Sequence, residues 1–190
     1  MTALFVRYRR LQRRIRGGVL AVWIRIGGGS VGRRLQAERG VHLRWRPHRG
    51  LVFGDGVYLG VGTILDVPSS AKLVLGDRVK VMHYCVLAAS EEIQIGADTQ
   101  IAEMCSIRDA DHGTSLDGPM REQLLTEPTA IGADVWIGRG SVVLKGTLIG
   151  EGAVVGANSV ARGVIPPRVI AVGAPTRVIR SRGAAPPQNH

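Results

Sequence analysis

The chain of 190 residues is long enough for one domain with a buried core, and 45% hydrophobic with 21% charged residues is a globular composition. Aromatic residues make up only 4% while glycine occurs 26 times, which favours short repeated strands and tight corners over a core of large side chains. The two cysteines, Cys85 and Cys105, are too few for a disulfide framework and indicate a reducing cytoplasm.

The formal net charge of +10 is concentrated at the N-terminus. Residues 1–49 contain 13 arginines and one acidic residue, a balance of +12, whereas residues 50–190 contain 12 Lys or Arg and 14 acidic residues, a balance of −2. A nucleic-acid-binding protein would spread basic residues over its folded body and interleave aromatic ones, so the pattern argues against a nucleic-acid partner.

The first predicted element is a basic amphipathic helix near the N-terminus. Apolar residues recur at helical spacing, and arginines occupy most remaining positions: Leu4, Tyr8, Leu11, Ile15 and Val19 against Arg7, Arg9, Arg10, Arg13, Arg14 and Arg16. Such a helix could cap an open solenoid end, or it could also contact an anionic membrane through residues 1–26. The apolar run at 19–24 is too short to span a bilayer, and no signal-cleavage site follows it. The alternation of Val41, Leu43 and Trp45 predicts that strand structure begins soon afterwards.

A six-residue repeat dominates the rest of the chain. An aliphatic residue is followed by Gly or Ala, and a small or β-branched residue stands four positions on. The aliphatic positions are Phe53, Leu59, Leu65, Leu75, Val81, Leu87, Ile95, Ile101, Ile107, Ile131, Ile137, Val143, Ile149 and Val155. The glycine is expected to supply the permissive backbone of a corner. Cys85 and Cys105 fall at small positions, so we expect both in the core.

Interruptions of the repeat reveal how the units are arranged. Extra residues enter only after every third unit, at 71–74, 93–94 and 113–130. Three units therefore close one triangular coil, and successive coils stack about 4.8 Å apart as parallel strands. The sequence predicts an all-β solenoid, a parallel β-helix whose irregular segments all leave from one corner.

Four ordered landmarks accompany the repeat: DxDHG at 109–113, VWIG at 135–138, VIPPRVIAVGAP at 164–175 and RVIR at 177–180. Together with the repeat, they make residues 51–180 resemble the hexapeptide-repeat acetyltransferases, among them the galactoside, maltose and polysaccharide-biosynthesis O-acetyltransferases. The resemblance implies a left-handed helix, acetyl-CoA as donor, no metal, and a homotrimer with the cofactor slot between subunits. We divide the chain into an N-terminal arm and lead-in (1–50), the β-helix domain (51–175) with its loop 113–130, and a cofactor-side tail (176–190).

His112, at the mouth of the long loop, is the predicted catalytic residue. Acetyl transfer to a hydroxyl requires a base, and an imidazole with its ordinary pKa of about 6.5 is mostly neutral at pH 7. Asp109 and Asp111 could orient His112, or they could be charged corner residues. The other four histidines, His42, His48, His83 and His190, are expected to be structural or solvated.

The remaining site residues follow from the resemblance. Trp136 would line the groove or be a structural tryptophan, and the backbone N–H near Arg139 would bind the oxyanion. Cofactor contacts would come from Arg139, Ala157, Arg162, Arg177 and Arg180, with Arg162 replacing the Thr-Lys-Asp that the family often has before its proline pair. RVIR could instead form a solvated terminal helix. Met82 and Tyr84 occupy the place of an acceptor-binding asparagine in galactoside enzymes, which argues against galactoside as the acceptor.

These observations predict transfer of acetyl from acetyl-CoA to a saccharide hydroxyl, in a direct ternary complex. The acceptor would be an envelope or capsular saccharide, still lipid-linked at the cytoplasmic face of the membrane. The alternative is N-acetylation of an amino-sugar nucleotide or a small-molecule amine. A zinc carbonic anhydrase on the same helix would need three converging histidines, but only His83 and His112 lie within the repeat. A purely structural solenoid would not need the landmarks.

Overall fold

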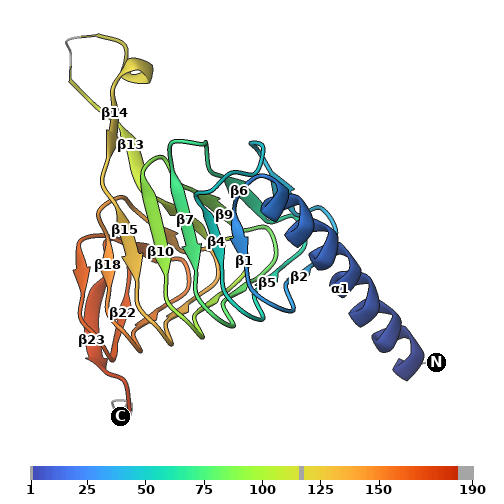
Figure 1. Ribbon diagram of the computed structural model, residues 1–190. Helices are drawn as coiled ribbons and strands as arrows, with labels where there is room; N and C mark the ends of the chain where they lie inside the picture. Colours follow the sequence, from blue (N-terminus) through green and yellow to red (C-terminus); the bar gives the residue numbers. More distant parts are fainter. Residues whose placement is uncertain (1, 116–117, 184–190) are drawn as a thin grey trace.

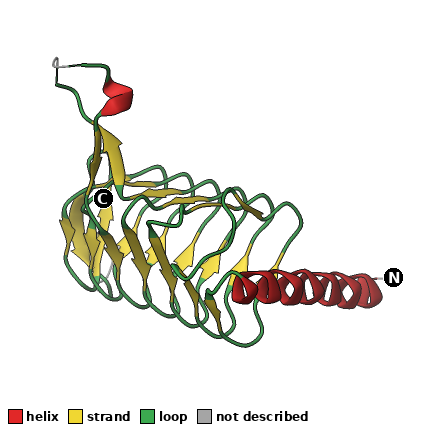
Figure 2. Ribbon diagram, turned by 45° about the horizontal axis from the view of Figure 1, so that its top comes forward, coloured by secondary structure: helices red, strands yellow, loops and turns green. Residues whose placement is uncertain are grey.

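The computed structural model describes residues 2–115 and 118–183. A long helix, α1 (Thr2–Ile26), precedes a solenoid of parallel strands, and a hairpin projects from the side of the solenoid (Figures 1 and 2). The described chain contains no helix that is both long and apolar enough to cross a membrane.

Three sheets form the three walls of the solenoid. Sheet A contains β1 (Ser30–Val31), β4 (Leu51–Phe53), β7 (Lys72–Leu75), β10 (Glu92–Ile95), β15 (Thr129–Ile131), β18 (Leu148–Ile149) and β21 (Val164–Ile165). Sheet B contains β2 (Gln36–Ala37), β5 (Tyr58–Leu59), β8 (Lys80–Val81), β11 (Gln100–Ile101), β16 (Trp136–Ile137), β19 (Val154–Val155), β22 (Val169–Val172) and β23 (Arg177–Ser181). Sheet C contains β3 (His42–Leu43), β6 (Ile64–Asp66), β9 (Val86–Ala88), β12 (Ser106–Arg108), β17 (Val142–Val143) and β20 (Val160–Ala161).

The chain visits sheets A, B and C in turn, so one strand from each makes a coil, and the predicted parallel β-helix with triangular coils is confirmed. Its coils begin at Ser30, earlier than the clear repeat that starts near residue 51, and β3 includes the Leu43 of the predicted alternation. We name the corners AB, BC and CA after the sheets that they join.

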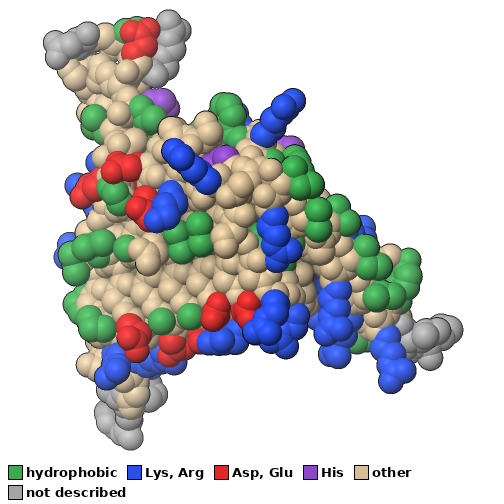
Figure 3. Space-filling model, in the orientation of Figure 1, with side chains coloured by type: hydrophobic (Ala, Val, Ile, Leu, Met, Phe, Trp, Pro, Cys, Tyr) green, Lys and Arg blue, Asp and Glu red, His purple; other side chains and the backbone are tan. Residues whose placement is uncertain are grey.

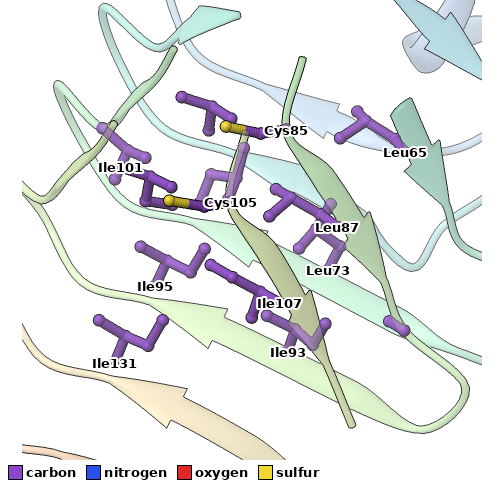
Figure 4. Packing of buried hydrophobic residues seen from close by; sticks show 14 of the residues in the cluster. Leu65, Leu73, Cys85, Leu87, Ile93, Ile95, Ile101, Cys105, Ile107 and Ile131 are labelled. Atoms are coloured by element: carbon purple, nitrogen blue, oxygen red, sulfur yellow. The ribbon is translucent and has the colours of Figure 1, made fainter. Parts of the chain in front are cut away.

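The aliphatic positions stack inside the prism. Ile95 lies between Leu75 and Ile131 in the strand register, and all three are nearly inaccessible to solvent. Cys85 and Cys105 lie side by side among these aliphatic chains, as the small positions predict (Figure 4). The neighbouring Cys105 thiol and burial both raise the pKa of the Cys85 thiol. The hydrogen bond with Cys85 lowers the pKa of the Cys105 thiol, but both side chains are almost wholly inaccessible to solvent, so both are core groups and not nucleophiles.

The glycines of the repeat serve a different purpose from the one expected. Gly132, which follows Ile131, does not adopt a left-handed conformation, but a Cβ there would lie 2.7 Å from the backbone nitrogen of Glu151 in the next coil. The left-handed residue at this corner is Asp134, with φ 52°. Glycine is thus required because adjacent coils approach too closely for a side chain, and the expectation of a permissive backbone at that position was wrong.

The longer connections leave from the CA corner, as predicted, but the extra residues predicted at 71–74 and 93–94 were misplaced, because most of these positions lie in the strands β7 and β10. Residues 44–50, 67–71, 89–91 and 109–128 each connect a strand of sheet C to the next strand of sheet A. The longest contains the projecting hairpin, in which β13 (Ala110–His112) pairs antiparallel with β14 (Leu124–Thr126) and the short 3₁₀ helix η1 (Met120–Glu122) precedes β14. The CA corner therefore carries the longest connections of the described solenoid.

The two ends of the solenoid are finished differently. At the N-terminal end, α1 packs on β1 and β2 through Gly17, Ala21 and Ile24, all buried. At the C-terminal end, β23 turns back and pairs antiparallel with β22, so the RVIR segment is a strand and the alternative of a terminal helix was wrong. The helix thus shields the first coil, whereas at the other end β20, β21 and β23 are the last strands of sheets C, A and B.

Candidate active site

His112 lies on β13, at the base of the projecting hairpin and not within a coil. Its Nδ1 is 3.1 Å from the carbonyl oxygen of Met120, on the short helix η1. Because a carbonyl only accepts hydrogen bonds, Nδ1 must carry the proton of the neutral ring. The lone pair that can accept a proton is therefore on Nε2.

The His112 side chain lines a cavity of about 420 Å³ at the CA corner. Asp111 and Leu124 of the hairpin contribute to one wall, and Trp45 and Asp66 of earlier coils contribute to another. The Trp45 indole N–H donates to the Asp66 carboxylate at 2.7 Å. The cavity is thus lined by aromatic, acidic and imidazole groups, a combination suited to a hydroxylated ligand.

Asp109 does not contact His112. Its side chain is fully buried, and its two carboxylate oxygens accept hydrogen bonds from the backbone N–H of Ser90 at 2.7 Å and of Glu91 at 2.8 Å. These bonds join the base of the hairpin to the preceding turn of the CA corner. These contacts give Asp109 a structural role at the base of the hairpin, and its predicted role in orienting His112 stays a prediction.

Trp136 lines a different cavity. Its side chain is 57% exposed on sheet B, beside Gln100 and Val154, in a depression of about 490 Å³. Asp134 and Arg182 border the same depression, joined by an ion pair of 2.7 Å. Within one chain, Trp136 and His112 therefore belong to separate surfaces.

The BC corner collects four of the predicted residues. Arg139 and Ala157 are exposed there on consecutive coils, and the N–H of Asn158 donates to the Arg139 carbonyl at 2.8 Å. Met82 and Tyr84 lie at the same corner two coils earlier, with the Tyr84 ring packed over Gly62. One corner thus holds both the donor-site and the acceptor-site candidates from sequence.

The other predicted arginines lie elsewhere. Arg162 is exposed at the CA corner after β20, and Arg177 and Arg180 are on β23 at the edge of sheet B. Within one chain, the predicted site residues therefore lie in three separate places: the CA corner, the BC corner and the edge of sheet B.

Sequence reasoning missed Trp45 and Asp66 as lining residues. The available signal was their separation of 21 residues, about one coil, combined with an indole N–H that needs an acceptor.

His48 and His83 have structural contacts, because a ring nitrogen of each binds a backbone group of a neighbouring coil. The partner of His48 is the Val67 carbonyl, and the partner of His83 is the Val61 N–H. His190 lies outside the described residues. Among the described residues, no three or more His, Cys, Asp or Glu side chains form a group that could hold a metal.

A solenoid of triangular coils with a six-residue repeat is the architecture of the hexapeptide-repeat proteins. The family model described as "Bacterial transferase hexapeptide (six repeats)" matches residues 128–163. The Escherichia coli K12 protein WbbJ, provisionally named a lipopolysaccharide biosynthesis O-acetyl transferase, is 37% identical over 137 residues, covering 67% of this chain and 70% of WbbJ. The chain belongs to the hexapeptide-repeat acetyltransferase family, and the predicted resemblance is confirmed.

Two further comparisons extend this assignment. Rv3034c of Mycobacterium tuberculosis H37Rv, provisionally named an acetyltransferase, is 35% identical over 147 residues, which are 76% of this chain and about half (49%) of Rv3034c. A variant of AntD, an N-acyltransferase from Bacillus cereus, was solved with dTDP-4-amino-4,6-dideoxyglucose and coenzyme A. It superposes with a TM-score of 0.72 at 26% identity, covering 84% of this chain and 87% of AntD.

Proposed function

We propose that this acetyltransferase moves the acetyl group of acetyl-CoA to a saccharide hydroxyl, with His112 as general base. The observation that carries the proposal is the hydrogen bond from His112 Nδ1 to the Met120 carbonyl, because it presents Nε2 as the proton acceptor. The contact with the Met120 carbonyl, made within the β13–β14 hairpin, orients the ring before the base acts.

The chemistry requires one base and no covalent enzyme intermediate. As the acceptor oxygen attacks the thioester carbonyl carbon, its proton passes to His112 Nε2. The tetrahedral oxyanion would be stabilised by a backbone N–H near Arg139. Collapse breaks the carbon–sulfur bond, and the thiolate takes the proton from His112, which leaves an acetyl ester, coenzyme A and the neutral enzyme.

Acetyl-CoA would bind along the BC corner. Arg139 and Ala157 are exposed there on consecutive coils, so an extended pantetheine could lie across them. Arg177 and Arg180 on β23 are candidates for its phosphates, because guanidinium groups present paired donors to phosphate oxygens. Arg162 is a further candidate, which from the CA corner would act on the cofactor of a neighbouring chain.

We propose a homotrimer because one chain does not assemble the whole site. His112 is at the CA corner, whereas Arg139 is at the BC corner. A neighbouring prism that places its BC corner against the His112 cavity would bring the base and the donor together. Asp111, which lines the cavity with His112, is our candidate for the carboxylate that stabilises the charged imidazole.

For the acceptor, we propose an envelope or capsular saccharide carried on a lipid at the cytoplasmic face of the membrane. Support comes from the name of WbbJ, and from the exposed Tyr84 and half-buried Met82 beside the proposed donor corner. Aromatic and thioether side chains form apolar surface against which sugar rings can pack.

The second candidate is transfer to an amine of an amino-sugar nucleotide. It is favoured by the likeness to AntD, which was solved with an amino-sugar nucleotide. The same base and donor site would serve both reactions. Labelled acetyl-CoA offered with hydroxyl and amine acceptors in parallel distinguishes them, because alkaline hydroxylamine releases the label from an ester but not from an amide.

His112→Ala tests the proposal directly. We expect kcat to fall by about 10² to 10⁴ with little change in affinity for acetyl-CoA, because base assistance acts in the transition state. His42→Ala is the control, since His42 is also exposed but lies on β3, in the first coil. A His112→Ala enzyme with wild-type turnover on the acceptor that the wild type uses would assign the base elsewhere.

A further inference from the structure

Helix α1 has an apolar face that the solenoid does not cover. Eight of its large hydrophobic side chains are between 46% and 79% exposed: Phe5, Tyr8, Leu11, Ile15, Val19, Val22, Trp23 and Ile26. At 3.6 residues per turn these eight fall on one continuous side of the helix, which we call the apolar stripe. An exposed apolar surface of this length marks an interaction site.

The stripe is separate from the face that caps the solenoid. Capping uses Gly17, Ala21 and Ile24, which lie on the opposite side of the helix and are buried. A Cβ on Gly17 would overlap the carbonyl of Leu35, so the helix is as close to the first coil as backbone allows. The cap therefore does not use the apolar stripe.

Arginines border the stripe on both sides. Helical geometry places Arg7 and Arg14 along one edge and Arg9 and Arg16 along the other. The helix has seven arginines and no acidic residue between Thr2 and Ile26. Figure 3 shows hydrophobic side chains along one edge of α1 and basic side chains along the other. Figure 2 shows the helix extending well beyond the coils, where a flat surface could reach it.

We propose that α1 docks on an anionic phospholipid surface, lying parallel to it with the apolar stripe in the headgroup layer. Charge complementarity favours an anionic lipid surface over a second copy of the chain. A second copy of α1 would bring another seven arginines and no acid against the first, whereas anionic headgroups neutralise both edges while acyl chains take up the stripe. The surface does not depend on the proposed reaction, so its test uses no acetyl transfer.

The experiment is flotation of the full-length protein with vesicles. Vesicles of phosphatidylcholine containing about a third phosphatidylglycerol are compared with pure phosphatidylcholine, at low and high NaCl. We expect binding to the anionic vesicles that falls at least about ten-fold as salt rises, because each arginine near the surface contributes separately and screening shortens its range.

A double variant isolates the stripe. Ile15→Ser with Val19→Ser should weaken binding at low salt on the order of ten-fold or more, because the lost groups are buried only in the membrane. The matched control is Leu148→Ser with Val164→Ser, two exposed apolar residues at the far end of sheet A. We expect circular dichroism to show that both variants are folded, because all four substituted side chains are exposed.

Three outcomes would overturn the inference. One is equal binding to neutral and anionic vesicles, and another is a stripe variant that binds as tightly as the wild type. The third is a wild-type protein that binds no vesicles, together with a stripe variant whose mass by light scattering is lower than that of the wild type and of the control variant. That last result would assign the stripe to contact between copies of the chain.

Discussion

Replacing Asp109 with alanine should destabilise the protein without direct damage to the chemistry. The substitution removes a fully buried carboxylate that accepts from the N–H groups of Ser90 and Glu91, at 2.7 and 2.8 Å. A hydrogen bond to a charged group contributes about 1.5–3 kcal/mol, and water can reach these part-buried amides in the variant. We therefore expect a loss of about 2–4 kcal/mol in the free energy of unfolding.

Urea denaturation followed by circular dichroism measures this loss, at one fixed protein concentration because assembly contributes to apparent stability. Asp111→Ala is the matched control, since Asp111 is exposed two residues further along and should change stability by less than about 0.5 kcal/mol. If Asp109→Ala is as stable as the wild type, the two hydrogen bonds do not hold the hairpin. If it is stable but inactive, Asp109 has the catalytic role that its contacts argue against.

Two further predictions concern the cap and the donor site. Gly17→Ala should lower the free energy of unfolding by about 1–3 kcal/mol because its Cβ would overlap the Leu35 carbonyl, whereas Gly18→Ala, with open space around its Cβ, should raise it by about 0.5–1 kcal/mol. Thermal denaturation compares the two, and equal shifts would show that the helix does not pack as described. Arg139→Ala should raise KM for acetyl-CoA about ten-fold with a smaller change in kcat, and an unchanged KM in steady-state kinetics would remove Arg139 from the donor site.

The coil architecture could be predicted because its signal is local. Each unit of the repeat contributes one inward aliphatic residue, and an interruption after every third unit indicates the corner at which extra residues leave. Ile95, Ile131 and the two buried cysteines are therefore where the repeat places them. The need for glycine at Gly132 was predicted correctly but for the wrong reason, because the contact that excludes a Cβ comes from Glu151 in the next coil.

The candidate site could be predicted only in part. The contacts that side chains make at the corners depend on how neighbouring coils and the hairpin are placed, and the sequence does not give those distances. The position of His112 followed from the landmarks, but the carbonyl that orients its ring belongs to Met120 within the hairpin. Asp109 resembles a catalytic carboxylate in sequence, yet burial and two backbone donors make it structural. The Trp45 and Asp66 pair required the coil-to-coil register before its hydrogen bond could be recognised.

The distribution of charge gives the proposed membrane contact a direction. Residues 50–190 carry a formal balance of −2, so the later coils have little attraction for an anionic surface, whereas residues 1–49, which form α1 and the first coil, carry +12. Such an asymmetry orients a molecule before contact, with its basic end toward the negative surface. Because α1 is fixed to the first coil through buried Gly17, Ala21 and Ile24, docking the helix would also fix the orientation of the prism. The cavity beside His112 would then stand at a constant height above the lipid, where a lipid-linked saccharide could reach it.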